Sequence, residues 1–251
     1  MERSQNELEL ALESAAKDEA ARPRFYEVLL QSQVLVVPAG DIPAHVGGVV
    51  QADAILSLPT TEINGTAYVP FYSSENRLSP GTAWLELSAV DLLNITRGAH
   101  LVLNHGSAYG KAFLPDEIAS LLDGSMFKPA ETFTAPAGQQ QLIGQPKEYP
   151  HQFVAAVARY LASEPSVERA FLAQHFIAGV HTQPAILIAL VALEEGFERI
   201  AGAVGVIAKD TRKAAGAVDV TRLKRGQLGY FENEAPIYER KKRGFFERLF
   251  G

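Results

Sequence analysis

The sequence predicts an α+β protein of two small domains, each with a mixed or antiparallel sheet and helices packed on that sheet. Three observations predict this class. The chain has 251 residues, more than one compact domain usually holds. Segments whose apolar residues have helical spacing alternate along the chain with short apolar runs typical of strands. Between residues 123 and 150 both periodicities fade, which divides the chain into two parts.

The expected domain boundaries follow from that division. Residues 1–125 form the N-terminal domain, 126–149 a linker, 150–239 the C-terminal domain and 240–251 a basic and aromatic tail. The linker is assigned because it is rich in proline and alanine and contains three glutamines in succession. Such a composition favours irregular chain between domains.

In the N-terminal domain, helices are expected where apolar spacing and start signals agree. Ser88 is a plausible N-cap with Asp91 three residues later, and Pro115 precedes two acidic residues that favour a helix N-terminus. The dipeptide Asn64-Gly65 is typical of a tight turn between two strands. The expected helices lie near residues 8–16, 24–31, 88–93 and 115–122, and the expected strands at 34–37, 52–58, 67–71, 84–87 and 100–104.

The C-terminal domain shows the element order α-β-β-α-β with short connections. This order argues for a small α+β domain whose helices pack on one side of an antiparallel or mixed sheet. The expected elements are helices at 152–163 and 196–209 and strands at 167–177, 185–193 and 218–223.

Composition and charge narrow the functional classes. Cysteine is absent, which excludes disulfides, thiol nucleophiles and cysteine-ligated metals. The net charge of the chain is −6. Residues 240–251 carry a local charge of +4, so the remaining residues carry −10. Such an acidic body offers no footprint for nucleic acid. The N-terminus lacks the pattern of a secretory signal, and the longest apolar run, 185–193, is too short to span a bilayer. We therefore expect a soluble cytoplasmic protein.

One glycine-rich segment invites comparison with a phosphate-binding loop. Asn104, Gly106, Gly110 and Lys111 lie between an expected strand and an expected helix. A phosphate loop has four residues between its glycines and a Ser or Thr after the lysine, whereas three residues intervene here and Ala112 follows. A tight glycine turn with a solvated lysine is the simpler interpretation, and a small-ligand loop is the alternative.

No catalytic or metal-binding set emerges from residue spacing. The six histidines form no HxH or HExxH pair, and His175 and His181 lie in or near separate strands. Ser73-Ser74 lacks the glycines of a nucleophile elbow. We therefore predict no catalytic residues, no metal and no cofactor.

The C-terminal tail is the more promising binding feature. If it is helical from residue 244, its large apolar side chains share one face, and such side chains are costly to leave in water. It could fold back on its own body, dock into a partner protein or lie on a membrane surface. A short turn with few apolar side chains binds membranes weakly, so membrane contact is not expected. The predicted partner-binding residues are Lys241, Lys242, Arg243, Phe245, Phe246, Leu249 and Phe250.

Four segments resemble the SseB family, the bacterial enhanced serine sensitivity proteins. They are LELALESAAKDEAARPRFYEVLLQSQVLVV near the start, VPFYSSENRL, LVLNHGSAYGKAFLPDEIASLL, and AVDVTRL near the end. One departure is His105, where the family more often has proline, which would loosen the turn after Asn104. The resemblance spans both domains. It implies a two-domain cytoplasmic bacterial protein linked to serine sensitivity, with no established enzyme activity.

Three functional hypotheses follow from the sequence. The leading one is a non-enzymatic protein-binding or adaptor protein that uses the tail to contact its partner. The alternative is an amino-acid or small-metabolite sensor or enzyme that uses the loop from Asn104 to Lys111. A third is self-association through exposed apolar surface.

Overall fold

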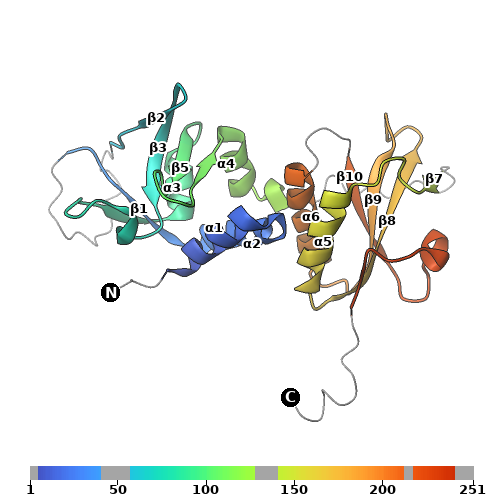
Figure 1. Cartoon of the computed structure of the whole chain (residues 1–251). Helices are drawn as coiled ribbons and strands as arrows, with labels where there is room; N and C mark the ends of the chain where they lie inside the picture. Colours follow the sequence, from blue (N-terminus) through green and yellow to red (C-terminus); the bar gives the residue numbers. More distant parts are fainter. Residues whose placement is uncertain (1–4, 41–56, 128–140, 212–216, 241–251) are drawn as a thin grey trace, which may run out of the picture. The chain divides into compact units, whose positions relative to one another are not determined.

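The protein is described here by a computed structural model that covers residues 5–40, 57–127, 141–211 and 217–240 (Figure 1). The chain divides into two compact units, residues 1–126 and 127–251. Each unit combines helices with one mixed sheet, so the predicted α+β class is confirmed. Among the described helices, none combines the length and the apolarity needed to cross a membrane.

The described residues of the first unit form four α-helices, and local start signals explain where three of them begin. The side chain of Asn6 caps α1 by accepting from the Glu9 amide, and that of Ser88 caps α3 by accepting from the Asp91 amide. Pro115 opens α4 with two acids behind it. The helices are α1 (Glu7–Lys17), α2 (Arg22–Gln31), α3 (Ala89–Ile95) and α4 (Pro115–Leu122), with 3-10 turns at Glu19–Ala21, Glu75–Arg77 and Ser125–Phe127.

The sheet of the first unit has the strand order β4-β1-β3-β5-β6, with β2 also paired to β3. Its strands are β1 (Gln33–Val36), β2 (Thr61–Ile63), β3 (Thr66–Tyr72), β4 (Leu85–Ser88), β5 (His100–Leu103) and β6 (Lys111–Phe113). The pair β3 and β5 is parallel, whereas the other pairs in this sheet are antiparallel. The carboxyl ends of β3 and β5 therefore meet at the same edge.

The structure corrects two predictions in this unit: which strand precedes the Asn64-Gly65 turn, and where the glycine-rich loop ends. Asn64 and Gly65 do form a hairpin turn with positive φ values of 50° and 80°, but the strand before it is β2. Most of the expected strand at 52–58 lies outside the described residues, and positions 57 and 58 are not in a strand. The glycine-rich segment, expected to be a loop as far as the helix, ends in β6. The core beside these strands includes the buried rings of Phe25, Phe71 and Phe113.

The second unit follows the expected α-β-β-α-β order and adds two short strands. Its main elements are α5 (His151–Ala162), β8 (Val167–Ile177), β9 (Ala185–Ala192), α6 (Phe197–Thr211) and β10 (Val218–Leu223). The added strands are β7 (Gln141–Gly144) and β11 (Tyr238–Glu239), both antiparallel to β8, and a 3-10 turn spans Gly229–Asn233. The strand order is β10-β9-β8-β11, with β7 also on β8. Because β7 lies within the range expected to be a linker, that range is not irregular throughout.

The two faces of this sheet differ in what covers them. Helices α5 and α6 contact each other and lie on one face, with α5 against β8 and α6 against β10 (Figure 1). The opposite face carries an apolar cluster that includes Phe171, Leu187 and Val191 and is covered by Phe231 from the 3-10 turn. Alternation along a strand places His175 on the same face as Phe171, and Asp219 on the same face as Leu223, which packs against that cluster.

Candidate functional site

The carboxyl edge of the parallel pair β3 and β5 holds a buried polar network. Ser73 follows β3, and Asn104 follows β5; the two residues are 4% and 1% exposed. The Asn104 Oδ1 atom accepts a hydrogen bond from the Ser73 backbone N–H at 2.9 Å, and Asn104 Nδ2 donates to Ser73 Oγ at 2.9 Å. Asn104 has a φ of 52°, a left-handed conformation that asparagine tolerates. The side-chain amide of Asn104 therefore connects the ends of β3 and β5 by hydrogen bonds.

Helix α1 completes this network with the carboxylate of Glu9, which is buried. Glu9 Oε1 accepts from Ser73 Oγ at 2.9 Å, Ser74 Oγ at 2.7 Å and Arg77 Nε at 2.9 Å. Burial acts to raise the pKa of Glu9, but the hydrogen bonds from Arg77, Ser74 and Ser73 outweigh it and hold the pKa below the ordinary value. The carboxylate thus stays ionised while buried, with its charge compensated by Arg77.

The remaining residues of the predicted ligand loop are placed as follows. Gly106 has a φ of 78° and open space where a side chain would begin. Gly110 lies so close to the backbone that a β-carbon would be 2.9 Å from the Leu103 carbonyl oxygen. Lys111 Nζ pairs with Glu117 at 2.8 Å and lies over the ring of Phe113, 4.9 Å from its centre. The polar side chains of Asn104 and Lys111 are both engaged within the unit.

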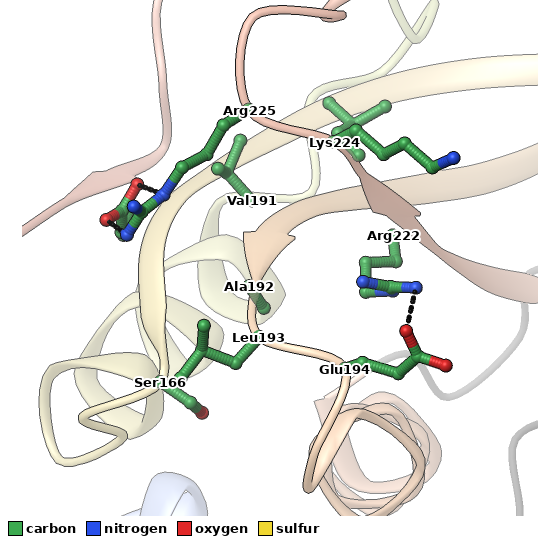
Figure 2. A pocket seen from close by; sticks show the side chains of 10 residues that line it. Ser166, Val191, Ala192, Leu193, Glu194, Arg222, Lys224 and Arg225 are labelled. Carbon is green, nitrogen blue, oxygen red and sulfur yellow. Dashed lines mark hydrogen bonds and ion pairs between the residues drawn. The ribbon is translucent and has the colours of Figure 1, made fainter.

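The second unit also has a parallel pair, β9 and β10, and its carboxyl edge lines a pocket of about 280 Å³ (Figure 2). The ends of β9 and β10 and the start of β8 line it. Arg222 pairs with Glu194 at 3.0 Å, and Arg225 pairs with Glu168. Lys224 forms no ion pair with any residue that the structure describes. Pockets at this position in α/β sheets commonly receive ligands.

The C-terminal tail begins at a fixed point on this unit. Residue 240 follows β11, and its backbone N–H donates to the Glu168 carbonyl at 2.8 Å. The Arg240 guanidinium donates from Nε to the Val167 carbonyl at 3.0 Å and from a second nitrogen to the Glu164 carbonyl. The predicted partner-binding residues all lie beyond it, in residues 241–251, outside the described part of the chain.

A histidine cluster on the sheet face opposite α5 and α6 was not predicted from residue spacing. His175 Nε2 lies 2.6 Å from Asp219 Oδ2, and His181 Nε2 lies 3.0 Å from the same oxygen. Burial acts to raise the pKa of Asp219, but the two histidines outweigh it and hold that pKa below the ordinary value. The three residues come from β8, from the turn after it and from β10, so spacing along the chain contained no signal for their meeting.

Fold and sites together define a class of protein: two α+β units in which each mixed sheet carries one parallel strand pair with polar groups at its carboxyl edge. Family models agree with this division. One described as SseB protein N-terminal domain matches residues 8–120, and one described as SseB protein C-terminal domain matches residues 135–240.

Whole-chain relatives give the same assignment. The proteins named Protein SseB from Escherichia coli (strain K12) and from Shigella flexneri are each 33% identical to this chain over 255 residues. The aligned region covers 98% of this chain and 96% of each relative. The chain belongs to the SseB family. No solved structure matches it significantly.

Proposed function

We propose that this protein is a non-enzymatic adaptor that binds a partner protein through its C-terminal segment, residues 241–251. The observation that carries the proposal is the anchoring of Arg240. Backbone and side-chain hydrogen bonds hold this residue to the carbonyls of residues 164, 167 and 168. The segment therefore starts from a defined point on the sheet, and its partner would be held beside the second unit.

The chemistry of the segment indicates the kind of partner surface. Three basic residues, Lys241 to Arg243, precede GFFERLFG, which contains three phenylalanines and one leucine. Aromatic side chains of short peptides commonly bind in apolar grooves, and basic residues beside them favour an acidic rim. The expected partner surface is an apolar groove bordered by carboxylates.

Affinity purification from the native host tests the proposal with three baits: the full chain, a chain that stops at Arg240, and the double variant Phe245→Ala, Phe246→Ala. A specific partner should be recovered by the full chain and lost with both altered baits. The purified partner should then bind the full chain directly, and a synthetic peptide of residues 241–251 should compete for it.

A matched control separates binding from folding. Far-UV circular dichroism and thermal unfolding should be the same for all three baits, because the hydrogen bonds and packing contacts of the two described folds involve residues up to Arg240. If the three baits recover the same partners, or if the peptide fails to compete, the tail does not mediate binding and the adaptor proposal is wrong.

A second candidate function is supported by the position of the glycine-rich loop. Asn104 and Gly106 follow the carboxyl end of a parallel strand, where small ligands commonly bind in open sheets. An amino-acid or small-metabolite sensor should show saturable thermal stabilisation by its ligand, and Lys111→Ala should abolish it. If neither amino acids nor nucleotides stabilise the protein, this candidate is excluded for those ligand classes.

A further inference from the structure

Two imidazoles and one carboxylate converge on the face of the second sheet opposite α5 and α6. His175 lies near the end of β8, His181 in the turn between β8 and β9, and Asp219 near the start of β10. Their nearest nitrogen and oxygen atoms all lie within 4.8 Å of one another. His175 is 5% exposed, and the side chains of His181 and Asp219 are 10% and 26% exposed. The cluster is thus mostly buried but open to solvent on the side of Asp219.

The outer nitrogens of both rings are held by groups that set the ring orientations. The Ile177 backbone N–H donates to His181 Nδ1 at 3.0 Å. The side-chain nitrogen of Gln141, on the neighbouring strand β7, lies 3.0 Å from His175 Nδ1. A metal-binding histidine commonly donates its outer N–H to an acceptor, whereas both Nδ1 atoms face N–H groups here, so these outer hydrogen bonds must change when an ion binds. Here both Nε2 atoms face the same carboxylate oxygen.

We propose that His175, His181 and Asp219 form a binding site for a divalent transition-metal ion, with Zn²⁺ as the fitting ion. Two imidazoles with one carboxylate are a donor set that zinc takes in proteins, whereas magnesium and calcium require more oxygen ligands. Three protein ligands leave a fourth position for water or another small ligand. The exposure of Asp219 places that position toward solvent.

Metal binding would move protons in a defined way. Because His181 Nδ1 accepts from the Ile177 amide, the single hydrogen of a neutral His181 is on Nε2, pointing at Asp219. When the ion binds to His181 Nε2, the ring hydrogen must be on Nδ1 instead. The Ile177 N–H can then no longer donate to Nδ1, so this amide must turn away from the ring. At His175 the same move requires only that the Gln141 side-chain amide rotates, so that its oxygen accepts from Nδ1. The Ile177 amide is therefore a specific reporter of the bound state.

Isothermal titration of the metal-stripped full chain with Zn²⁺ tests the proposal. We expect one ion per chain, and we expect affinity to fall about tenfold or more in Asp219→Asn and in His175→Gln. The variants His105→Ala and His151→Ala remove exposed histidines elsewhere and should bind as the parent does. The chain that stops at Arg240 should also bind, so failure of the adaptor proposal would not affect this result.

A second measurement keeps the proposal testable if the cluster variants fail to fold. In the parent protein labelled with ¹⁵N, saturating Zn²⁺ should shift the Ile177 amide resonance and the ring ¹⁵N resonances of His175 and His181. Weak binding at more than one site, affinity unchanged in the cluster variants, or unchanged resonances for these three residues would overturn the assignment.

Discussion

The carboxyl edges of the two parallel strand pairs have opposite characters. At the ends of β3 and β5 the polar side chains are buried and bonded to one another. At the ends of β9 and β10 the polar side chains are charged and solvated, and a pocket remains. The same strand arrangement therefore produces a structural network in one unit and an open surface in the other.

The difference arises from what covers each edge. In the first unit, α1 brings the Glu9 carboxylate into hydrogen-bond contact with Ser73 and Ser74, so the polar groups at this edge are paired with one another. In the second unit, the acid that pairs with Arg222 is Glu194, whose side chain is 86% exposed. Buried polar groups are costly to leave unpaired, whereas exposed ion pairs contribute little. Substitutions should therefore affect stability at the first edge and leave it nearly unchanged at the second.

The largest expected effect is that of Asn104→Ala. Asn64→Ala is a matched control, because Asn64 has nearly the same φ, 50° against 52°, but is exposed in a turn. The control loses only the tolerance of asparagine for this conformation, about 1 kcal/mol. Asn104→Ala also leaves the Ser73 N–H unpaired, so we expect a total loss of about 2–4 kcal/mol. Urea unfolding followed by the fluorescence of Trp84, the single tryptophan, reports on the first unit. Equal losses in the two variants would mean that the network contributes nothing.

The pH dependence of the first unit should depend on Glu9. Its folded pKa lies below the ordinary glutamate value of 4.5, so in acid the unfolded state binds more protons than the folded state. The stabilisation by this carboxylate is therefore fully present above the ordinary pKa and is lost as pH falls through the lowered value.

Glu9→Gln should be less stable than the parent at pH 7 and should lose less stability between pH 5 and pH 3. The measurement is urea unfolding by Trp84 fluorescence at each pH. Glu62→Gln, which removes an exposed carboxyl on β2, corrects for the loss of one charge. An unchanged acid slope in Glu9→Gln would contradict the assigned role of the network.

Backbone crowding at the first edge gives an intermediate effect. In Gly110→Ala the new β-carbon would lie 2.9 Å and 3.1 Å from the carbonyl oxygens of Leu103 and Asn104, so we expect a loss of about 1–2 kcal/mol. Gly205→Ala, in α6, meets no atom within 4 Å and should stabilise its helix by about 0.5–1 kcal/mol. Thermal unfolding should show shifts of opposite sign. A stabilising Gly110→Ala would mean that the loop is free to relax.

The smallest effects are those of two ion pairs. Lys111→Ala breaks a pair whose side chains are 28% and 18% exposed and removes the contact with the Phe113 ring, so we expect a loss of about 1 kcal/mol. Arg222→Ala should cost less than about 0.5 kcal/mol, because Glu194 is largely solvated. Hydrogen exchange of the amides around each ion pair, measured in each variant and in the parent, gives the local loss of stability at the two edges. A larger loss from Arg222→Ala would show that the open edge is not merely a solvated surface.

Elements with strong local signals were predicted well, and short paired strands were missed. The Ser88 cap and the proline start at Pro115 act within one helical turn, so they can be read from neighbouring residues. The strands β6, β7 and β11 are three, four and two residues long and depend on their partner strands. Segments this short have no periodicity of their own, which is why the sequence pattern of residues 126–149 favours a linker.

The sequence by itself determined the two-unit α+β organisation, the family, and most helices and long strands. The family is identified by motifs and the elements by the spacing of apolar residues, and both can be read from residues that are close in the chain. The tertiary structure alone decided which polar side chains meet. Glu9 and Ser73 are 64 residues apart, and His175 and Asp219 are 44 residues apart. Their contacts depend on strand order and register, which place distant residues on one edge or face of a sheet, and residue spacing along the chain does not reveal that order.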